Sequence, residues 1–159
     1  MNNDRGFHTV RGYQLLEQEK RLLTSAMEDY LEMIYRNSLE AGYLRINTLS
    51  ELLNVHPSSS TKMVQKLTQL GMLDYQKYGI IFLTEKGKEI GEFLFKRHTI
   101  IETFLKSIGT AENALVETEL IEHNISTRTL ETIDLLNRFI MENPDFIERF
   151  EKFKAAQID

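Results

Sequence analysis

The chain has 159 residues, a formal net charge of −5 and 42% hydrophobic residues, which suffices for one or two small domains with a buried core. It contains no cysteine, which excludes disulfides, thiolate zinc sites, iron–sulfur clusters and cysteine nucleophiles. It also lacks a run of about 18 apolar residues and any signal-peptide pattern, so we expect a cytoplasmic protein with no membrane partner.

The charge is distributed unevenly along the chain. Residues 42–97 hold eight Lys or Arg against five Asp or Glu, a balance of +3, whereas residues 98–159 hold six against twelve, a balance of −6. A basic segment can face nucleic-acid phosphates and an acidic segment can bind cations, although a shift of this size also arises by chance.

Residues 1–24 form an N-terminal extension whose role the sequence does not reveal. Leucines at helical spacing in residues 12–23 are typical of an extra helix, and a disordered arm carrying Arg5 and Arg11 is the alternative. The next helix is predicted to begin with Ser25 as its cap and Glu28 at the third position, as in a capping box. Its expected buried stripe consists of Tyr30, Leu31, Met33 and Ile34.

A short helix over residues 47–53 and a tight turn at residues 54–56 come next. Pro57, a favoured first-turn residue, then leads a helix to Leu70, and Gly71 ends it. This spacing is typical of a helix-turn-helix. On the second helix the apolar residues Met63, Val64, Leu67 and Leu70 cluster on one side.

The opposite side of that helix is small, polar and basic. Such a face can enter the major groove of DNA, although a polar solvent-facing surface has the same composition. Two β-prone runs, residues 72–76 and 80–83, then flank a turn at residues 77–79 and predict a hairpin, the wing of a winged helix-turn-helix. The residues that we expect to contact DNA are Ser58, Ser59, Thr61, Lys62, Gln65, Lys66 and, at the wing tip, Lys77.

Three helical segments carry potential metal ligands made of oxygen and imidazole. Positions three and four apart share one helix face, so the ligands within each segment can converge, although charged pairs at this spacing are often a solvated surface. The pattern favours a carboxylate-rich, binuclear metal site. Its candidate ligands are Asp29, Glu32, His98, Glu119, Glu122 and His123.

The remaining helices are defined by their caps. Thr84 begins a long helix that runs to Gly109 and contains His98, with the stripe Ile90, Phe93, Leu94, Ile101, Phe104 and Leu105. Ser126 and Pro144 begin two further helices. Their apolar sides, led by Leu130, Ile133, Leu136, Phe139, Ile140, Phe146, Ile147, Phe150 and Phe153, fit either a dimer interface or an intramolecular core.

Several of these motifs together resemble the manganese transport regulators of the diphtheria toxin repressor family. The resemblance rests on the run from Met27 to Glu32, the run from His56 to Leu67, the pair Arg97-His98 and the Glu-x-x-Glu-His element, and it covers residues 25–141. Two flanking positions depart from the family pattern, since Leu120 and Asn124 stand where Gly and His are usual.

The resemblance implies a mainly α-helical, homodimeric, metal-activated repressor that binds double-stranded operator DNA. It implies a winged helix-turn-helix domain over residues 25–96 and a helical metal-binding and dimerisation domain over residues 97–159. The six ligands match two manganese sites per subunit, whereas the iron-responsive branch has softer Met and Cys at the positions of Asp29 and Glu119. Hard carboxylates suit Mn(II), with Fe(II), Co(II), Zn(II) and Cd(II) as other possible occupants.

Two other classes of protein remain as alternatives. A winged-helix regulator that senses an organic ligand would bind its operator fully without metal. A binuclear-metal enzyme of the ferritin-like kind would have Glu-x-x-His pairs on two helices of a bundle, whereas here Glu122 and His123 are adjacent. No nucleophile or substrate-binding motif stands out, so we do not expect an enzyme.

Overall fold

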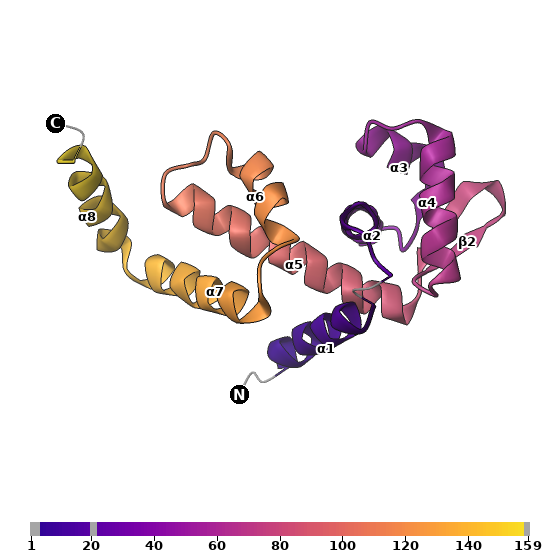
Figure 1. Ribbon diagram of the computed structural model, residues 1–159, viewed down its shortest axis with the longest axis horizontal. Helices are drawn as coiled ribbons and strands as arrows, with labels where there is room; N and C mark the ends of the chain where they lie inside the picture. The colour runs from indigo at the N-terminus through magenta and orange to yellow at the C-terminus, as the bar shows by residue number, and fades with distance from the viewer. Residues whose placement is uncertain (1–3, 20–21, 158–159) are drawn as a thin grey trace. The chain divides into compact units, whose positions relative to one another are not determined.

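The computed structural model describes residues 4–19 and 22–157, with helices linked by short turns and one small sheet (Figure 1). The chain divides into two compact units, residues 1–95 and 96–159. Within the described ranges, no helix combines the length and the apolarity needed to cross a bilayer.

The N-terminal extension contains a helix, α1 (Asp4–Glu19), which packs on the start of α5 (Glu85–Ser107). Gly12 allows this close approach, because a Cβ there would lie 2.4 Å from the carbonyl oxygen of Glu89. The Arg11 Nε also lies 2.9 Å from the Glu89 Oε2. The helix begins and ends earlier than the predicted span of residues 12–23, and residues 1–3 and 20–21 lie outside the described residues.

Helix α2 (Ser25–Ser38) begins one residue away from the predicted cap. Thr24, not Ser25, is the N-cap, and its hydroxyl accepts a hydrogen bond of 3.3 Å from the Met27 amide. The prediction was wrong because both residues carry a capping hydroxyl and only the backbone conformation distinguishes them. The buried residues of α2 are Met27, Tyr30, Leu31, Glu32, Ile34 and Ser38.

The predicted helix-turn-helix consists of α3 (Ile46–Leu52) and α4 (Pro57–Gln69). Asn54 in the turn and Gly71 after α4 have positive φ angles of 50° and 74°, which end the two helices. Val64 and Leu67 are fully buried, as expected, whereas the predicted core residues Met63 and Leu70 are half-buried.

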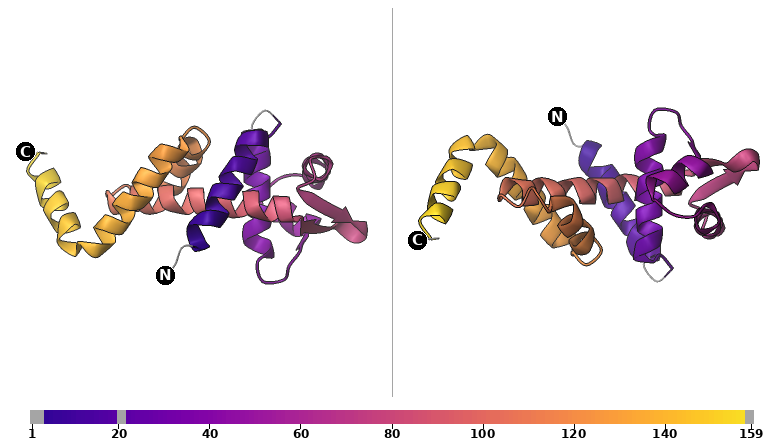
Figure 2. Two further views of the ribbon diagram at one scale, coloured as in Figure 1. Left: turned by 90° about the horizontal axis from the view of Figure 1, so that it is seen from below. Right: turned by 90° about the horizontal axis from the view of Figure 1, so that it is seen from above.

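An antiparallel sheet completes the N-terminal unit. Strands β2 (Leu73–Gln76) and β3 (Ile80–Leu83) form the predicted hairpin, and β1 (Leu44–Arg45) pairs with β3, so the strand order is β1-β3-β2. The hairpin turn, η1 (Lys77–Gly79), is a short 3₁₀ segment. Figure 2 shows the hairpin projecting beyond α3 and α4, as a wing does.

Helix α5 begins as predicted. The Thr84 hydroxyl accepts a hydrogen bond of 3.1 Å from the Gly87 amide and so caps the helix. Most of the predicted stripe is buried, and Phe104 is half-buried. Two polar residues of α5, Arg97 and His98, are buried as well.

The C-terminal unit joins the end of α5 to α6 (Ala114–Glu122), α7 (Thr127–Glu142) and α8 (Pro144–Ala155). Ser126 caps α7 through a 3.3 Å hydrogen bond from the Thr129 amide. Asn137 of α7 donates 2.9 Å to the Ile100 carbonyl of α5, and Lys154 of α8 donates 3.2 Å to the Ile108 carbonyl. These bonds attach α7 and α8 to the long helix.

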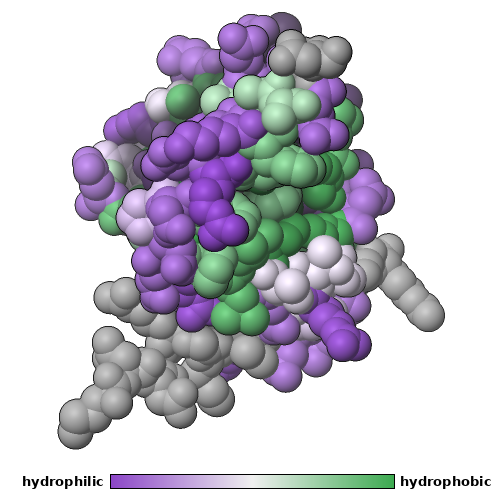
Figure 3. Space-filling model, turned by 90° about the vertical axis from the view of Figure 1, so that its left-hand side faces the viewer, coloured by the Kyte–Doolittle hydropathy of each residue, from purple (hydrophilic) through white to green (hydrophobic). Residues whose placement is uncertain are grey.

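Part of the apolar surface of this unit faces outward, and Figure 3 shows a band of hydrophobic side chains at the α8 end of the chain. Of the predicted stripe on α7, Leu130 and Ile140 are buried, whereas Leu136 and Phe139 are exposed. We define the apolar face of α6–α8 as its large exposed hydrophobic residues, namely Leu115, Val116, Leu120, Ile121, Leu135, Leu136, Phe139, Met141 and Phe153. Patches of this kind mark interaction surfaces.

Candidate metal centre and DNA-binding surface

Helix α6 directs one acidic side chain into the C-terminal unit. Its buried residues Ala114, Thr118 and Glu122 are four apart, so they share one face of the helix. The Thr118 hydroxyl donates 2.6 Å to the Ala114 carbonyl, which satisfies that buried polar group within the helix. Glu122 is only 4% exposed, so its carboxylate requires a partner inside the unit.

Helix α5 supplies that partner. His98 lies on the same stripe as the buried Leu94, Ile101 and Leu105, and is 5% exposed. Its Nδ1 lies 3.1 Å from the Glu122 Oε2, within hydrogen-bond reach. An imidazole and a carboxylate therefore meet in a nearly dry environment, although 24 residues separate them in the chain.

A second imidazole adjoins this pair. His123 is the C-cap of α6 and is not inside the helix, and its Nε2 lies 3.9 Å from the Glu122 Oε1. The His123 Nδ1 lies 3.4 Å from the Nη2 of Arg97, a buried residue of α5. The C-terminal unit therefore brings together three of the six predicted ligands, His98, Glu122 and His123.

The separation of these groups suits a divalent cation. Two neighbouring ligands of one octahedral ion, each about 2.0–2.6 Å from it, lie about 2.8–3.7 Å apart. The 3.1 Å between the His98 Nδ1 and the Glu122 Oε2 falls in this range. The donors are imidazole and carboxylate, which suit hard to intermediate metals such as Mn, Fe, Co and Zn.

The other three predicted ligands are an exposed residue of α6 and two residues of the N-terminal unit. Glu119 is exposed on α6, one turn before Glu122. Asp29 and Glu32 belong to α2 in the N-terminal unit, three residues apart and therefore on one helix face. Asp29 is half-buried and Glu32 is buried, with its Oε1 3.6 Å from the Arg36 Nη1.

The predicted DNA-contacting residues lie on the surface of the N-terminal unit. Thr61 is half-buried, and its hydroxyl donates 3.0 Å to the Pro57 carbonyl, so it is the least available member of the set. The exposed members are Ser58, Ser59, Lys62, Gln65 and Lys66 on α4 and Lys77 at the hairpin turn. A single helix therefore presents polar and basic groups next to a basic wing tip, as groove recognition requires.

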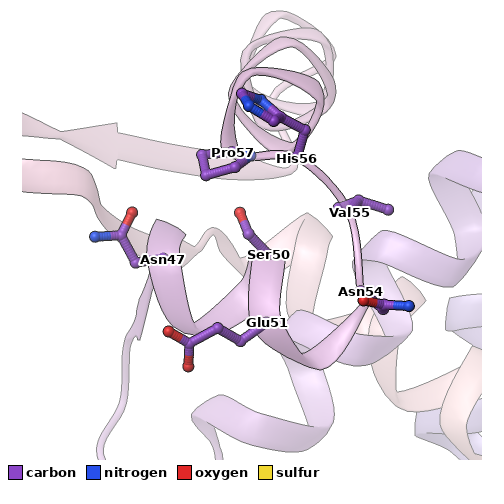
Figure 4. A pocket seen from close by; sticks show the side chains of 7 residues that line it. All are labelled: Asn47, Ser50, Glu51, Asn54, Val55, His56 and Pro57. Atoms are coloured by element: carbon purple, nitrogen blue, oxygen red, sulfur yellow. The ribbon is translucent and has the colours of Figure 1, made fainter.

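Local hydrogen bonds hold the turn that precedes α4. Figure 4 shows a pocket lined by side chains of α3, of this turn and of the first residue of α4. His56 is the N-cap of α4, and its Nδ1 accepts a 3.3 Å hydrogen bond from the Ser58 amide. The hydroxyl oxygens of Ser50 and Ser60, both buried, lie 2.9 Å apart and connect α3 to α4. Helix α4 is thereby fixed to α3.

The wing tip carries a feature that the sequence did not reveal. Tyr78 has a φ of 65° and is 90% exposed. The left-handed region is unfavourable for a bulky residue, so the turn stores backbone strain at a surface position.

Sequence reasoning also missed two buried groups. Arg97 is three residues from Leu94 and four from Ile101, so it falls on the core stripe of α5, and this spacing was the available signal. The pair Ser50 and Ser60 had no such signal, because two polar residues ten positions apart reveal no contact.

Comparison with known proteins assigns the chain to a protein family. Residues 22–81 match the family model described as "Iron dependent repressor, N-terminal DNA binding domain". Residues 84–151 match the model described as "Iron dependent repressor, metal binding and dimerisation domain". The chain belongs to the iron-dependent repressor family and is a metal-dependent, DNA-binding transcriptional regulator, not an enzyme. Its partners are operator DNA and a second copy of itself.

Individual relatives agree. The chain is 49% identical over 118 residues to the HTH-type transcriptional regulator MntR of Oceanobacillus iheyensis, covering 73% of this chain and 80% of that one. It is 42% identical over 133 residues to the MntR of Lysinibacillus sphaericus, covering 83% and 96%.

Solved structures resemble the fold. The manganese regulator SloR matches with a TM-score of 0.63 and 28% identity, over 71% of this chain and 54% of that chain. T. acidophilum IdeR matches with a TM-score of 0.61 and 26% identity, over 70% and 53%. The chain thus spans about half the length of these two proteins.

Proposed function

We propose that this protein is a manganese-responsive repressor of metal-uptake genes that acts in the cytoplasm, where its operator DNA lies. The observation that carries the proposal is the buried pair His98 and Glu122, joined by His123, within the segment matched by the metal-binding family model. A buried carboxylate between two imidazoles is costly as a purely structural element and well suited to a cation.

The proposed ligand set has two parts. Asp29, Glu119, Glu122 and His123 hold one Mn(II), and Glu32 and His98 hold a second, with Glu119 and Glu122 bridging the two. The buried contact between His98 and Glu122 supports this set, because imidazole nitrogen and carboxylate oxygen are donor types that divalent first-row metals bind.

The preference for manganese rests on donor chemistry and on the relatives. The proposed set contains four carboxylates, two imidazoles and no sulfur, a composition that suits Mn(II). Two of the relatives are named MntR, and a similar structure is described as a manganese regulator. Fe(II), Co(II), Zn(II) and Cd(II) bind the same donor types and are the competitors that a test must include.

The proposed domains are a winged helix over residues 25–96 and a dimerisation domain over residues 97–159. Four carboxylates brought together without a counter-ion repel one another, so the metal-free protein resists the arrangement in which the ligand set is complete. A bound divalent cation supplies the charge that neutralises them. The resulting population shift restricts the spacing of the two α4 helices in a dimer to one that matches two operator half-sites.

The test begins with chelator-stripped, full-length protein. Duplex DNA is selected from a genomic library with and without Mn(II), and binding of the enriched site is then titrated with each competing metal. Enrichment only with metal supports the proposal, and the strongest stimulation by Mn(II) supports the assignment of manganese. Equal enrichment without metal would favour a regulator of the same fold that senses an organic ligand.

A matched pair of variants localises the effect. Glu122→Gln replaces the buried carboxylate by a neutral amide of similar size, whereas Glu131→Gln makes the same change at an exposed position of α7. We expect only the first to reduce Mn(II) binding, measured by dialysis against the metal. Unchanged Mn(II) binding by Glu122→Gln would overturn the ligand assignment.

A further inference from the structure

Arg97 places a permanent positive charge beside the proposed cation site. It precedes His98 on α5, is 6% exposed, and its Nη2 lies 3.4 Å from the Nδ1 of His123. A guanidinium stays protonated at all physiological pH values and can only donate hydrogen bonds. A cation of this kind beside a ligand that is expected to bind another cation requires an explanation.

The contact determines where the ring proton of His123 lies. Because Arg97 donates, the Nδ1 of His123 must offer its lone pair, and the proton of the neutral ring then lies on Nε2. The Nε2 faces the Glu122 Oε1 at 3.9 Å, an orientation that favours an N–H directed toward the carboxylate. Within the C-terminal unit, one ring nitrogen of His123 therefore contacts a cation and the other lies near an anion.

A metal ion can bind His123 only through a nitrogen lone pair. If it binds Nδ1, it occupies the position that the Arg97 guanidinium holds. If it binds Nε2, the ring proton moves to Nδ1 and then opposes the N–H groups of Arg97. Whichever nitrogen binds the metal, the contact between Arg97 and His123 is lost.

We propose that Arg97 is an internal competitor of the metal. It holds His123 by a hydrogen bond in the metal-free protein, and metal binding is weakened by the free energy needed to break that bond. This inference rests on the proposed role of His123 as a ligand. The contact between Arg97 and His123 stabilises the metal-free arrangement and is absent from the metal-bound one. It thereby raises the metal concentration at which the regulator responds.

The first test measures Mn(II) affinity of the full-length protein, with unbound Mn(II) quantified from its electron paramagnetic resonance signal. Loss of one hydrogen bond to a charged group corresponds to roughly a tenfold change in an equilibrium constant. We therefore expect Arg97→Met, which keeps the apolar stem, to tighten Mn(II) binding by about tenfold. Unchanged or weaker binding would overturn the proposal.

The same substitution in a His123→Ala background separates contact from charge. If Arg97 acts through His123, the gain from Arg97→Met disappears when His123 is absent. A gain of equal size in both backgrounds would mean that Arg97 acts only as a general positive charge, which contradicts the proposal. Arg97→Lys provides a second variant, since it keeps the charge but ends one bond short of the Nη2 position. Arg97→Lys should increase the Mn(II) affinity nearly as much as Arg97→Met does. An unchanged affinity in Arg97→Lys would indicate that Arg97 acts only through its charge.

A measurement on metal-free protein tests the contact without relying on metal binding. Nitrogen-15 NMR of the histidine rings reports which nitrogen carries the proton. We expect His123 in the wild type to have its proton on Nε2, and Arg97→Met to allow both tautomers. A proton on Nδ1 in the wild type would refute the inference, whereas failure of wild-type protein to bind Mn(II) would refute the proposed function instead.

Discussion

The hydroxyl groups of Ser50 and Ser60 connect the two helices of the DNA-binding motif, with their oxygens 2.9 Å apart and both side chains buried. Ser50 also bonds to the Ile46 carbonyl at 2.9 Å. A hydroxyl has one proton, so when Ser50 donates to Ile46, Ser60 is the donor to Ser50. The Ser60 hydroxyl therefore depends on Ser50 as its acceptor, whereas the Ser50 hydroxyl has its own bond to Ile46.

Removing either hydroxyl should therefore have different costs. Ser50→Ala leaves the Ser60 hydroxyl buried without its acceptor and should lower the free energy of unfolding by about 1–3 kcal/mol. Ser60→Ala leaves Ser50 bonded to Ile46 and should cost about 0.5–1.5 kcal/mol. Urea unfolding of both variants and of the double variant gives the coupling energy. Fully additive effects would show that the two hydroxyls do not interact.

The proposed metal ligands on the two units should matter for DNA binding and not for folding. We expect Asp29→Ala and Glu119→Ala to weaken Mn(II)-dependent operator binding by at least about tenfold, as loss of a supporting ligand interaction typically does. Metal-free thermal unfolding should change little, because neither residue is fully buried. Glu117→Ala, on the same helix as Glu119 and outside the proposed ligand set, is the control. Equal Mn(II)-stimulated binding in the wild type and both variants would contradict the ligand assignment.

Lys77 at the wing tip should act through phosphate contact. The logarithm of affinity falls linearly with the logarithm of salt concentration, and each phosphate that a lysine neutralises steepens this slope by about 0.9. Lys77→Gln should therefore reduce that slope by about 1 and weaken binding to all sequences alike. Lys152→Gln, an exposed lysine of α8 paired with Glu148, should leave the slope unchanged. Fluorescence anisotropy at several salt concentrations measures both, and equal slopes for the wild type and Lys77→Gln would exclude the contact.

The apolar face of α6–α8 should hold the dimer. Leu135 on α7 and Leu39 after α2 are almost equally exposed, at 59% and 57%, but only Leu135 belongs to that face. Leu135→Glu places a charge where apolar surface is to be buried and should shift sedimentation toward the monomer. Leu39→Glu serves as the matched control and should leave the dimer intact. A stable Leu135→Glu dimer would place the interface elsewhere.

The docking of α1 can be tested at Gly12. A Cβ at this position would lie 2.4 Å from the Glu89 carbonyl and 2.9 Å from the Phe93 Cβ, so Gly12→Ala should force α1 away from α5. Overpacking of this kind costs about 1–3 kcal/mol. We expect faster hydrogen exchange in α1, with Gln14→Ala at an exposed position of the same helix as the control. Unchanged exchange would mean that α1 does not pack in this way.

The elements of the fold were readable from the sequence where a local signal defines them. The caps Thr84 and Ser126 and the proline at the start of α4 mark three helix starts that the structure confirms. The start of α2 was misplaced by one residue, since Thr24 and Ser25 carry the same capping group. Strand β1 was missed because two residues hold no periodicity, and its pairing with β3 is a long-range contact.

The candidate site could be predicted only in part, because the sequence carries local signals and the site also depends on contacts between helices. Helical spacing predicts that Glu119 and Glu122 share a face, but it does not tell which of them is buried. Burial depends on how α6 packs, and this selects Glu122 with Ala114 and Thr118. The neighbour of His123 was not predicted either, because Arg97 reaches it from another helix. The assignment of all six ligands stays a prediction that the variants above will test.

The exposed apolar side of α7 has a consequence for the cell that contains this regulator. Subunits that must pair before they recognise two half-sites respond to their own abundance as well as to metal, because association depends on protein concentration. When the gene is weakly expressed, a given rise in metal concentration should produce less occupied operator. Gene dosage thus becomes a second determinant of the metal concentration at which the regulator responds, through exposed residues such as Leu135 and Phe139 that lie outside the proposed ligand set.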